Sequence, residues 1–222
     1  MIEIQRNNYG QKKITSSTFL NDSSIISICN DTLISVWNFY SDKVDLYPIS
    51  VNLNKLYVEK HGLYCIDNNG TVFRFQISGK QTILKELIKD KANEVYFKSE
   101  KEILIVNRHN LIFSDLNRSK KIKRNFNSQI TALSWNTEGN ILLGFKNGEI
   151  LECDSSLNIV HIYNSISDKI SSIGYVSDSI IISGSYDFSV VIQNKNEILY
   201  SILFDDWIVG IVIKNRDIIA CS

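Results

Sequence analysis

Residues 130–154 read ITALSWNTEGNILLGFKNGEILECD, and residues 170–194 read ISSIGYVSDSIIISGSYDFSVVIQN. The two stretches align from end to end without a gap, so that Ile130 matches Ile170 and Asp154 matches Asn194. Each contains three short apolar runs that are separated by turn residues, such as Asn147-Gly148 in the first stretch and Tyr186-Asp187 in the second. Runs of this length between turn signals are typical of β-strands. The pair therefore predicts a repeated unit of antiparallel strands.

The same unit recurs along the chain with a period of about 39 residues, and self-similarity at a fixed period of this size is typical of propellers and solenoids. The end of its third run falls at nearly constant intervals, at Trp37, Phe75, Ser114, Cys153 and Gln193. An aromatic residue precedes each of these markers at one constant distance, at Phe19, Tyr57, Tyr96, Trp135 and Tyr175. Of these, we expect Tyr96, Trp135 and Tyr175 to support the core by packing between neighbouring units.

The second runs are nearly continuous in apolar residues, which predicts strands that are covered on both faces. They are Ile25–Ile28, Leu63–Ile66, Ile103–Val106, Ile141–Gly144 and Ile181–Gly184.

A sixth copy begins at Trp207, which we expect to be a core residue, and stops before a third run. One period before Trp37, residues 1–5 read MIEIQ and alternate as a strand does. A circle of repeats closes when the first strand of the chain completes the last sheet, and closure removes unpaired edges. The sequence therefore predicts an all-β fold, a six-bladed β-propeller whose last blade is closed by the N-terminal strand. Residues 1–222 form a single domain on this interpretation, with blades at about 11–40, 50–78, 87–116, 127–156, 167–196, and 204–222 plus 1–7.

Residues 182–194, ISGSYDFSVVIQN, resemble the core signature of the WD-repeat β-propeller family, with Asp187 in the turn and Gln193 where the name-giving tryptophan usually stands. Trp37 keeps that tryptophan in the first repeat. The Gly-His pair that opens such repeats is absent, and of the family's hydrogen-bonded tetrad the fifth repeat retains only Ser183 and Asp187. The resemblance implies a propeller that serves as an interaction platform, and a divergent propeller outside the WD-repeat group is the alternative.

The composition favours strands and a reducing compartment. The chain has 35 isoleucines and 3 alanines, a balance that suits pleated sheets better than helices. No apolar run is long enough for a membrane span, and the N-terminus lacks the apolar core of a signal peptide. The cysteines Cys29, Cys65, Cys153 and Cys221 are far apart in apolar runs, so we expect buried thiols in a cytoplasmic or nuclear protein.

The sequence contains no pattern that argues for an enzyme. The three histidines, His61, His109 and His161, fall at unlike positions of the repeat, so we expect exposed residues and no metal site. Metalloprotease, phosphate-loop and nucleophile-elbow motifs are missing. We interpret the pair Asp205-Asp206 as a turn that leads into a strand. No catalytic residue, cofactor site or metal site is therefore predicted.

The polar connectors 41–48, 117–129 and 155–169 are expected to be loops. Residues 83–91 have apolar spacing that suits either a short helix or an outer strand with its loop.

One basic cluster stands out in the connector after residue 116, and it comprises Arg118, Lys120, Lys121, Lys123 and Arg124. It is either a solvated loop that keeps the surface soluble or an electrostatic dock for a partner. We predict a non-catalytic scaffold that binds other proteins through its rim loops as a subunit of a larger complex. The alternative is an RNA-associated accessory subunit, in tRNA modification or ribosome biogenesis, that orients RNA for a catalytic partner through these cations.

Overall fold

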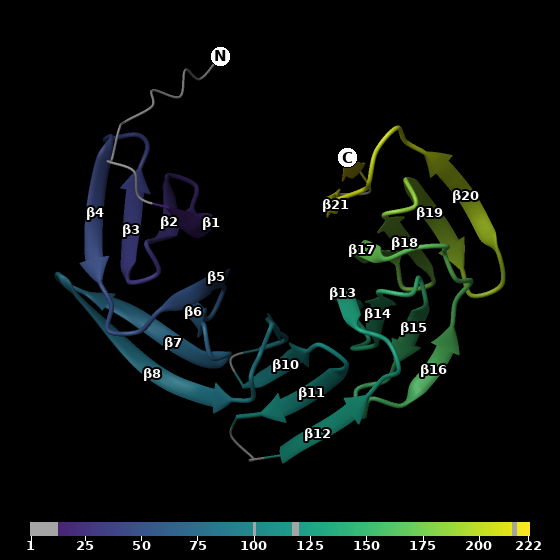
Figure 1. Cartoon of the computed structure of the whole chain (residues 1–222), viewed down its shortest axis with the longest axis horizontal. Helices are drawn as coiled ribbons and strands as arrows, with labels where there is room; N and C mark the ends of the chain where they lie inside the picture. Colours follow the sequence, from purple (N-terminus) through teal and green to yellow (C-terminus); the bar gives the residue numbers. More distant parts are fainter. Residues whose placement is uncertain (1–12, 100, 117–119, 215–216) are drawn as a thin grey trace. The chain divides into compact units, whose positions relative to one another are not determined.

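The computed structural model describes residues 13–99, 101–116, 120–214 and 217–222, and in these ranges it contains 22 β-strands and no helix (Figure 1). The strands form six antiparallel sheets, of which five have four strands and the last has two. The protein is therefore all-β, as its sequence predicts. No helix in the described ranges could cross a membrane. Residues 1–7, the predicted closing strand, lie outside the described part of the chain.

The chain divides into two compact units, residues 1–100 and 101–222. The strands β1 to β4 of the first unit form one sheet and span Ile14–Asn21, Ser24–Cys29, Leu33–Asn38 and Lys43–Pro48. The strands β5 to β8 form the next sheet and span Leu53–Glu59, Gly62–Asp67, Thr71–Ser78 and Gln81–Lys89. Strand β9 spans Glu94–Phe97.

The second unit begins with β10, β11 and β12, which span Glu102–Asn107, Asn110–Asp115 and Lys120–Asn125 in a sheet of order β12-β11-β10-β9. Strands β13 to β16 span Ile130–Trp135, Ile141–Phe145, Ile150–Cys153 and Ile159–Ile162. Strands β17 to β20 span Ile170–Ser177, Ile180–Ser185, Ser189–Asn194 and Ile198–Leu203. The two-stranded sheet consists of β21 (Gly210–Lys214) and β22 (Asp217–Cys221).

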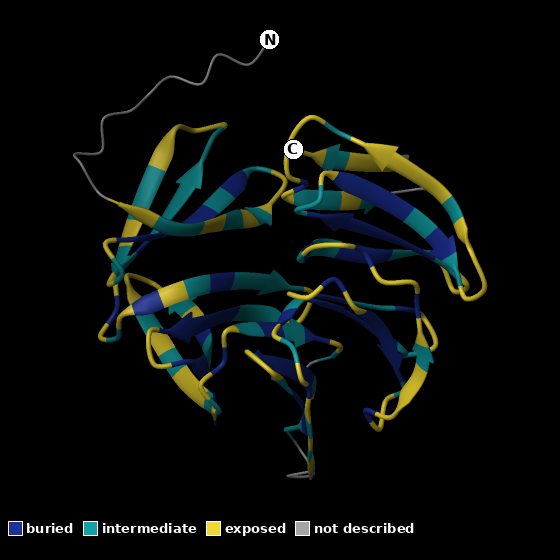
Figure 2. Cartoon of the chain, turned by 45° about the vertical axis from the view of Figure 1, so that its right-hand side comes forward, coloured by how far each residue is buried: buried dark blue, intermediate teal, exposed yellow. Residues whose placement is uncertain are grey.

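The predicted period is visible in the strand positions. The second strands of the five complete sheets begin at nearly constant intervals, at Ser24, Gly62, Glu102, Ile141 and Ile180. Each contains the apolar run that the sequence assigns to it, and these central strands are mostly buried (Figure 2). Burial on both faces explains why their sequences do not alternate between apolar and polar residues.

The prediction that the three polar connectors are loops is wrong, because each contains the fourth strand of a sheet. These strands are β4, β12 and β16. Strands β4 and β16 are exposed or half-buried along their length, so their side chains carry little apolar signal. Of the two alternatives for residues 83–91, the outer strand is the one observed, and there is no helix in this described segment. Strand β8 pairs with β7 from Ser78↔Gln81 to Thr71↔Lys89.

Neighbouring sheets within a unit bury their apolar faces against each other. In the first unit, Ile26, Ile28 and Ile34 pack with Leu56 and Phe75 of the next sheet. In the second unit, the β13–β16 sheet packs on the β17–β20 sheet through a core that contains Leu142, Ile170 and Ile181. A smaller core contains Ile182 and Val190 of the β17–β20 sheet. They pack with Ile208 and with Ile211 and Ile213 of β21. A single sheet of this size cannot cover its own faces, so each repeat depends on its neighbour.

Hydroxyl groups on the first strand of one sheet bind the backbone of the following repeat. The Thr131 hydroxyl donates to the Ile170 carbonyl at 2.6 Å, and the Ser171 hydroxyl donates to the Ile208 carbonyl. The Ser172 hydroxyl accepts a bond from the Ile211 amide at 3.1 Å. In the first unit the Ser16 hydroxyl accepts one from the Leu56 amide at 3.2 Å. The paired residues are 37 to 40 positions apart, so these bonds follow the repeat.

Two glycines allow the same close approach between repeats. A Cβ atom at Gly144 would lie 2.5 Å from Cγ2 of Ile170, and one at Gly184 would lie 2.5 Å from Cγ2 of Ile208. Ile170 and Ile208 are fully buried. Each isoleucine therefore occupies the space that a larger residue at the glycine would need.

We expect Gly184→Ala to lower the free energy of unfolding by about 1–3 kcal/mol, because the added methyl group overpacks the contact with Ile208. Urea denaturation measures the change. Gly210→Ala is the matched control, since no atom lies within 4 Å of its added Cβ, and it should change stability by less than about 0.5 kcal/mol. Equal stabilities of the two variants would contradict this account of the packing.

Candidate partner-binding surfaces

The basic cluster lies mostly on an edge strand. Arg118 is outside the described residues, and Lys120 begins β12, the outer strand of its sheet. Lys121 and Lys123 are exposed and stand opposite Ser114 and Ile112 of β11. Alternate residues of a strand point to one side, so these two lysines share a face. Two exposed lysines therefore lie on the same side of this edge strand.

Arg124, the last member of the cluster, is engaged within the second unit. Its Nη1 donates to the Leu157 carbonyl at 2.8 Å, and its guanidinium lies 5.6 Å from the ring centroid of Phe126. Leu157 belongs to the β15–β16 turn, where hydrogen bonds from Asn158 hold the pKa of Asp154 below its ordinary value and the charge of Arg124 lowers that pKa further. Arg124 thus connects β12 to the next sheet.

A second group of polar residues surrounds the fully buried Glu152 of β15. Its Oε1 accepts a bond from the Tyr175 hydroxyl at 3.0 Å, and its Oε2 lies 2.7 Å from Nζ of Lys195. Burial, and then the charge of Glu152, raise the pKa of Tyr175 and of Tyr163 above the ordinary value of a phenol. Both hydroxyls therefore remain protonated at neutral pH. The carboxylate and its partners Tyr175 and Lys195 thus connect two neighbouring sheets.

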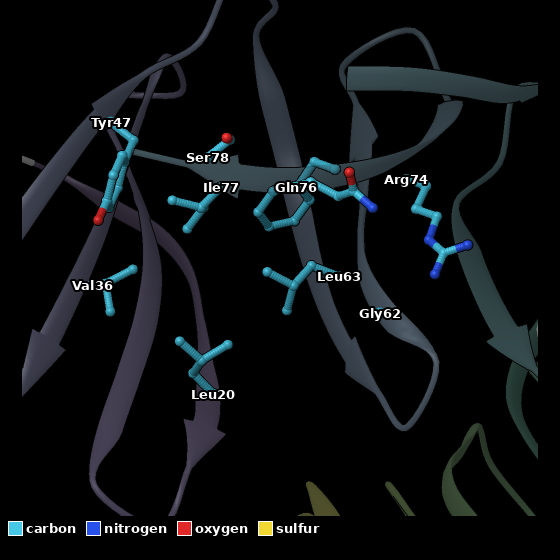
Figure 3. Close-up of a pocket in the computed structure, with 10 residues that line it drawn as sticks. Leu20, Val36, Tyr47, Gly62, Leu63, Arg74, Gln76, Ile77 and Ser78 are labelled. Carbon is cyan, nitrogen blue, oxygen red and sulfur yellow. The ribbon is translucent and has the colours of Figure 1, made fainter. Parts of the chain in front are cut away.

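The first unit contains an open pocket of about 620 Å³ between its two complete sheets (Figure 3). Leu20, Val36 and Leu63 line its apolar middle, with Tyr47 at one end and Arg74 at the other. The Arg74 Nη2 donates to the His61 carbonyl at 2.6 Å, and its guanidinium lies 5.9 Å from the ring centroid of Tyr64. The Arg74 guanidinium therefore binds the β5–β6 hairpin. The remaining surface of the pocket is mainly apolar.

A group of partly exposed aromatic side chains in the second unit lies near the start of β21. We call Lys169, Tyr186, Phe188 and Trp207 the aromatic patch. The rings of Tyr186 and Trp207 stack with centroids 5.2 Å apart and planes 10° apart, and Nζ of Lys169 lies 4.1 Å from the Tyr186 centroid. Trp207 is 52% exposed and Phe188 is 40% exposed. Aromatic residues that solvent can reach are the residues that most often dominate protein interfaces.

The backbone beneath the aromatic patch is held firmly. The Trp207 amide donates to Oδ1 of Asp206 at 2.7 Å, and the Ile208 amide donates to the Ser185 carbonyl at 3.1 Å. Phe188 has φ 72°, a conformation that is costly for a bulky side chain. Backbone strain of this kind clusters at functional sites. The patch is therefore a preorganised surface.

The sequence predicts Trp207 as a core residue, and this prediction is wrong, because the side chain is half-exposed. Strand β21 begins three residues later, at Gly210, and it is Ile208 that is fully buried. No pattern in the sequence marks the patch, because its members come from one hairpin turn and from the connectors before β17 and β21. The Asp205-Asp206 pair does precede that strand as an irregular connector, as predicted.

The histidines and cysteines also differ in part from expectation. His61 and His109 are exposed in turns, but His161 is half-buried in β16 with its ring 4.6 Å from that of Tyr163. Cys29, Cys65 and Cys153 are buried free thiols, whereas Cys221 is exposed. Burial raises the pKa of Cys65 to about 12 and, with smaller effects from nearby charges, that of Cys153 to about 11.

No protein-family model matches the chain, and no curated protein matches it. Solved structures do match, and 1339 of their chains resemble this one. Among them is the crystal structure of the computationally designed protein Ika8, with a TM-score of 0.73 and 16% sequence identity. The match covers 95% of this chain and 68% of that chain. At this identity the similarity concerns the fold alone.

We expect Arg124→Ala to lower the free energy of unfolding by about 1–3 kcal/mol, because the Leu157 carbonyl loses a charge-assisted hydrogen bond and Phe126 loses the covering guanidinium. Lys123→Ala, at the preceding position of the same strand, should change it by less than about 0.5 kcal/mol. Thermal or urea denaturation of both variants checks the difference. An Arg124→Ala protein as stable as the wild type would show that the contact with Leu157 contributes nothing.

Proposed function

We propose that the chain is a non-catalytic β-propeller of the WD-repeat type that binds protein partners through the aromatic patch as a subunit of a larger assembly. The observation that carries the proposal is the half-exposed indole of Trp207, which stacks on Tyr186 above a pinned backbone. A rigid aromatic surface binds a partner with little loss of side-chain entropy. The fold supplies the rigidity, since the repeats around the patch are tied to one another.

The propeller interpretation is supported by the last sheet, which has two strands where the other sheets have four. Val212 and Ile219 stand opposite each other on β21 and β22 and are 58% and 60% exposed. On β20, Ile202 stands opposite Val190, whose side chain belongs to the core beside β21, yet Ile202 is 53% exposed. Further strands beside β22 would extend the face of this sheet that carries Ile211 and Ala220 and packs on the β17–β20 sheet, and they would cover Ile202. Val212 and Ile219 lie on the opposite face of β21 and β22, which a strand at the edge does not cover. In our proposal residues 1–7 supply the next strand and make the sixth blade.

A cysteine scan tests this closure. We expect one cysteine among positions 2, 3, 4 and 5 to form an intramolecular disulfide with the exposed Cys221, because only the residue directly opposite on the neighbouring strand comes close enough. Peptide mapping of dilute oxidised protein detects the bond, and Cys221→Ser in the same background should abolish it. If no position in the scan cross-links, the N-terminal strand does not complete the last sheet.

Partner binding is tested by affinity capture from the native cell with quantitative mass spectrometry. We expect wild-type protein and the control Tyr40→Ala, which removes an 80% exposed tyrosine of the first unit, to recover the same stoichiometric proteins. Trp207→Ala should lose them, by tenfold or more in recovery, because an anchoring aromatic side chain contributes several kcal/mol to an interface. Recovery that Trp207→Ala leaves unchanged would refute the proposed binding surface.

The RNA-associated subunit is the second candidate, and the exposed Lys121 and Lys123 on one face of β12 favour it. The same affinity capture distinguishes RNA binding from protein binding when two arms are added. One arm treats the sample with ribonuclease, and the other uses a Lys121→Gln, Lys123→Gln double variant. Loss of the captured material in both of these arms, with salt sensitivity, would support RNA binding. Material that resists ribonuclease and the double variant, and that Trp207→Ala loses, supports protein binding through the aromatic patch.

A further inference from the structure

The surroundings of the aromatic patch are acidic. Four aspartates flank it in the two connectors and in the hairpin turn, namely Asp168, Asp187, Asp205 and Asp206. Lys169 is the only basic residue that these three segments contribute, over residues 163–169, 186–188 and 204–209, all of which the structure describes. Because the whole chain has no net charge, this surplus of carboxylates is a local feature. A partner that binds here must complement it.

Hydrogen bonds hold two of these carboxylates, those of Asp187 and Asp206. Burial alone would raise the pKa of Asp187, but hydrogen bonds from Ser189 and Ser167 hold it below its ordinary value. The Ser167 hydroxyl donates to Oδ2 of Asp187 at 2.7 Å, and the Asp206 carboxylate accepts the Trp207 amide. Asp205 and Asp206 are exposed directly beside Trp207 in the sequence. Asp187 and Asp206 are therefore held by hydrogen bonds in the same segments that carry Tyr186 and Trp207.

Aromatic faces and carboxylates together favour one kind of guest. A ring attracts a cation to its face, tryptophan most strongly, and the contact between Lys169 and Tyr186 shows that this patch already holds one ammonium group in that way. A planar guanidinium stacks on an indole and also forms paired hydrogen bonds with carboxylates. An apolar or acidic guest would instead desolvate or repel the carboxylates.

We propose that the aromatic patch binds an arginine side chain in a basic segment of the partner protein, with the guanidinium against Trp207 and its N–H groups on Asp205 and Asp206. This inference deepens the proposed function and rests on it. Lysine would bind less well, because its compact ammonium does not stack in the same way.

The test uses a labelled peptide of arginine, glycine and serine, together with matched peptides in which lysine or citrulline replaces arginine. Fluorescence anisotropy with the full chain should show binding in the order arginine, then lysine, then citrulline, and the affinity should fall as salt is raised. Trp207→Phe keeps an aromatic face and should retain most of the affinity. Trp207→Leu keeps an apolar side chain without the π-system and should lose about fivefold or more.

Asp205→Asn combined with Asp206→Asn should weaken the arginine peptide to a similar degree, and Tyr40→Ala should leave it unchanged. Thermal melting of each variant confirms that it is folded. Equal binding of the arginine and citrulline peptides, or equal affinity of Trp207→Phe and Trp207→Leu, would overturn the arginine inference. Partner capture that still depends on Trp207 would leave the proposed function standing in that case, whereas capture independent of Trp207 would refute the proposed function by itself.

Discussion

The structure depends on the contact between the first strand of one repeat and the start of the next. A hydroxyl at Thr131 or Ser171 holds the following backbone at the carbonyl of Ile170 or Ile208. The isoleucine at that point fills the space left by Gly144 or Gly184. Sheets of a few short strands cannot bury both faces alone, so the cohesion of each unit comes from these repeated contacts between neighbours. Their spacing is the structural counterpart of the period in the sequence.

Charged groups inside this framework are paired. Glu152 is fully buried but has Tyr175 and Lys195 as partners, and in the first unit Glu94 pairs with Tyr57 and Lys55. A buried carboxylate without such partners would cost several kcal/mol. Two of the aromatic markers of the period, Tyr57 and Tyr175, thus bring a polar group as well as a ring to the boundary between sheets. Phe19, the first marker, is 66% exposed.

The surfaces open to a partner are formed by side chains that do not take part in the contacts between sheets. Arg124 has the charge of a binding residue, yet the Leu157 carbonyl and the ring of Phe126 occupy it. Trp207 is a large aromatic residue of the kind usually found in a core. Its neighbour Ile208 is the residue that is buried in the core, and the Trp207 indole is half-exposed. The aromatic patch therefore combines a rigid backbone with an accessible π-surface and flanking carboxylates, which is the basis of both proposals.

The sequence alone determined the fold class, the period and the central strands, because these depend on local pattern: apolar runs between turn residues, repeated at a constant interval. It predicted the turn at Tyr186-Asp187 and the burial of Cys65 and Cys153 for the same reason. It missed the outer strands β4, β12 and β16, whose pairing is set by the neighbouring strand and not by their own side chains. Only the tertiary structure decided which charges are engaged and which aromatic residues face solvent. Arg124 and Leu157 belong to different sheets, and Tyr186 and Trp207 are joined across a hairpin and a connector, so their contacts exist only once the sheets have packed.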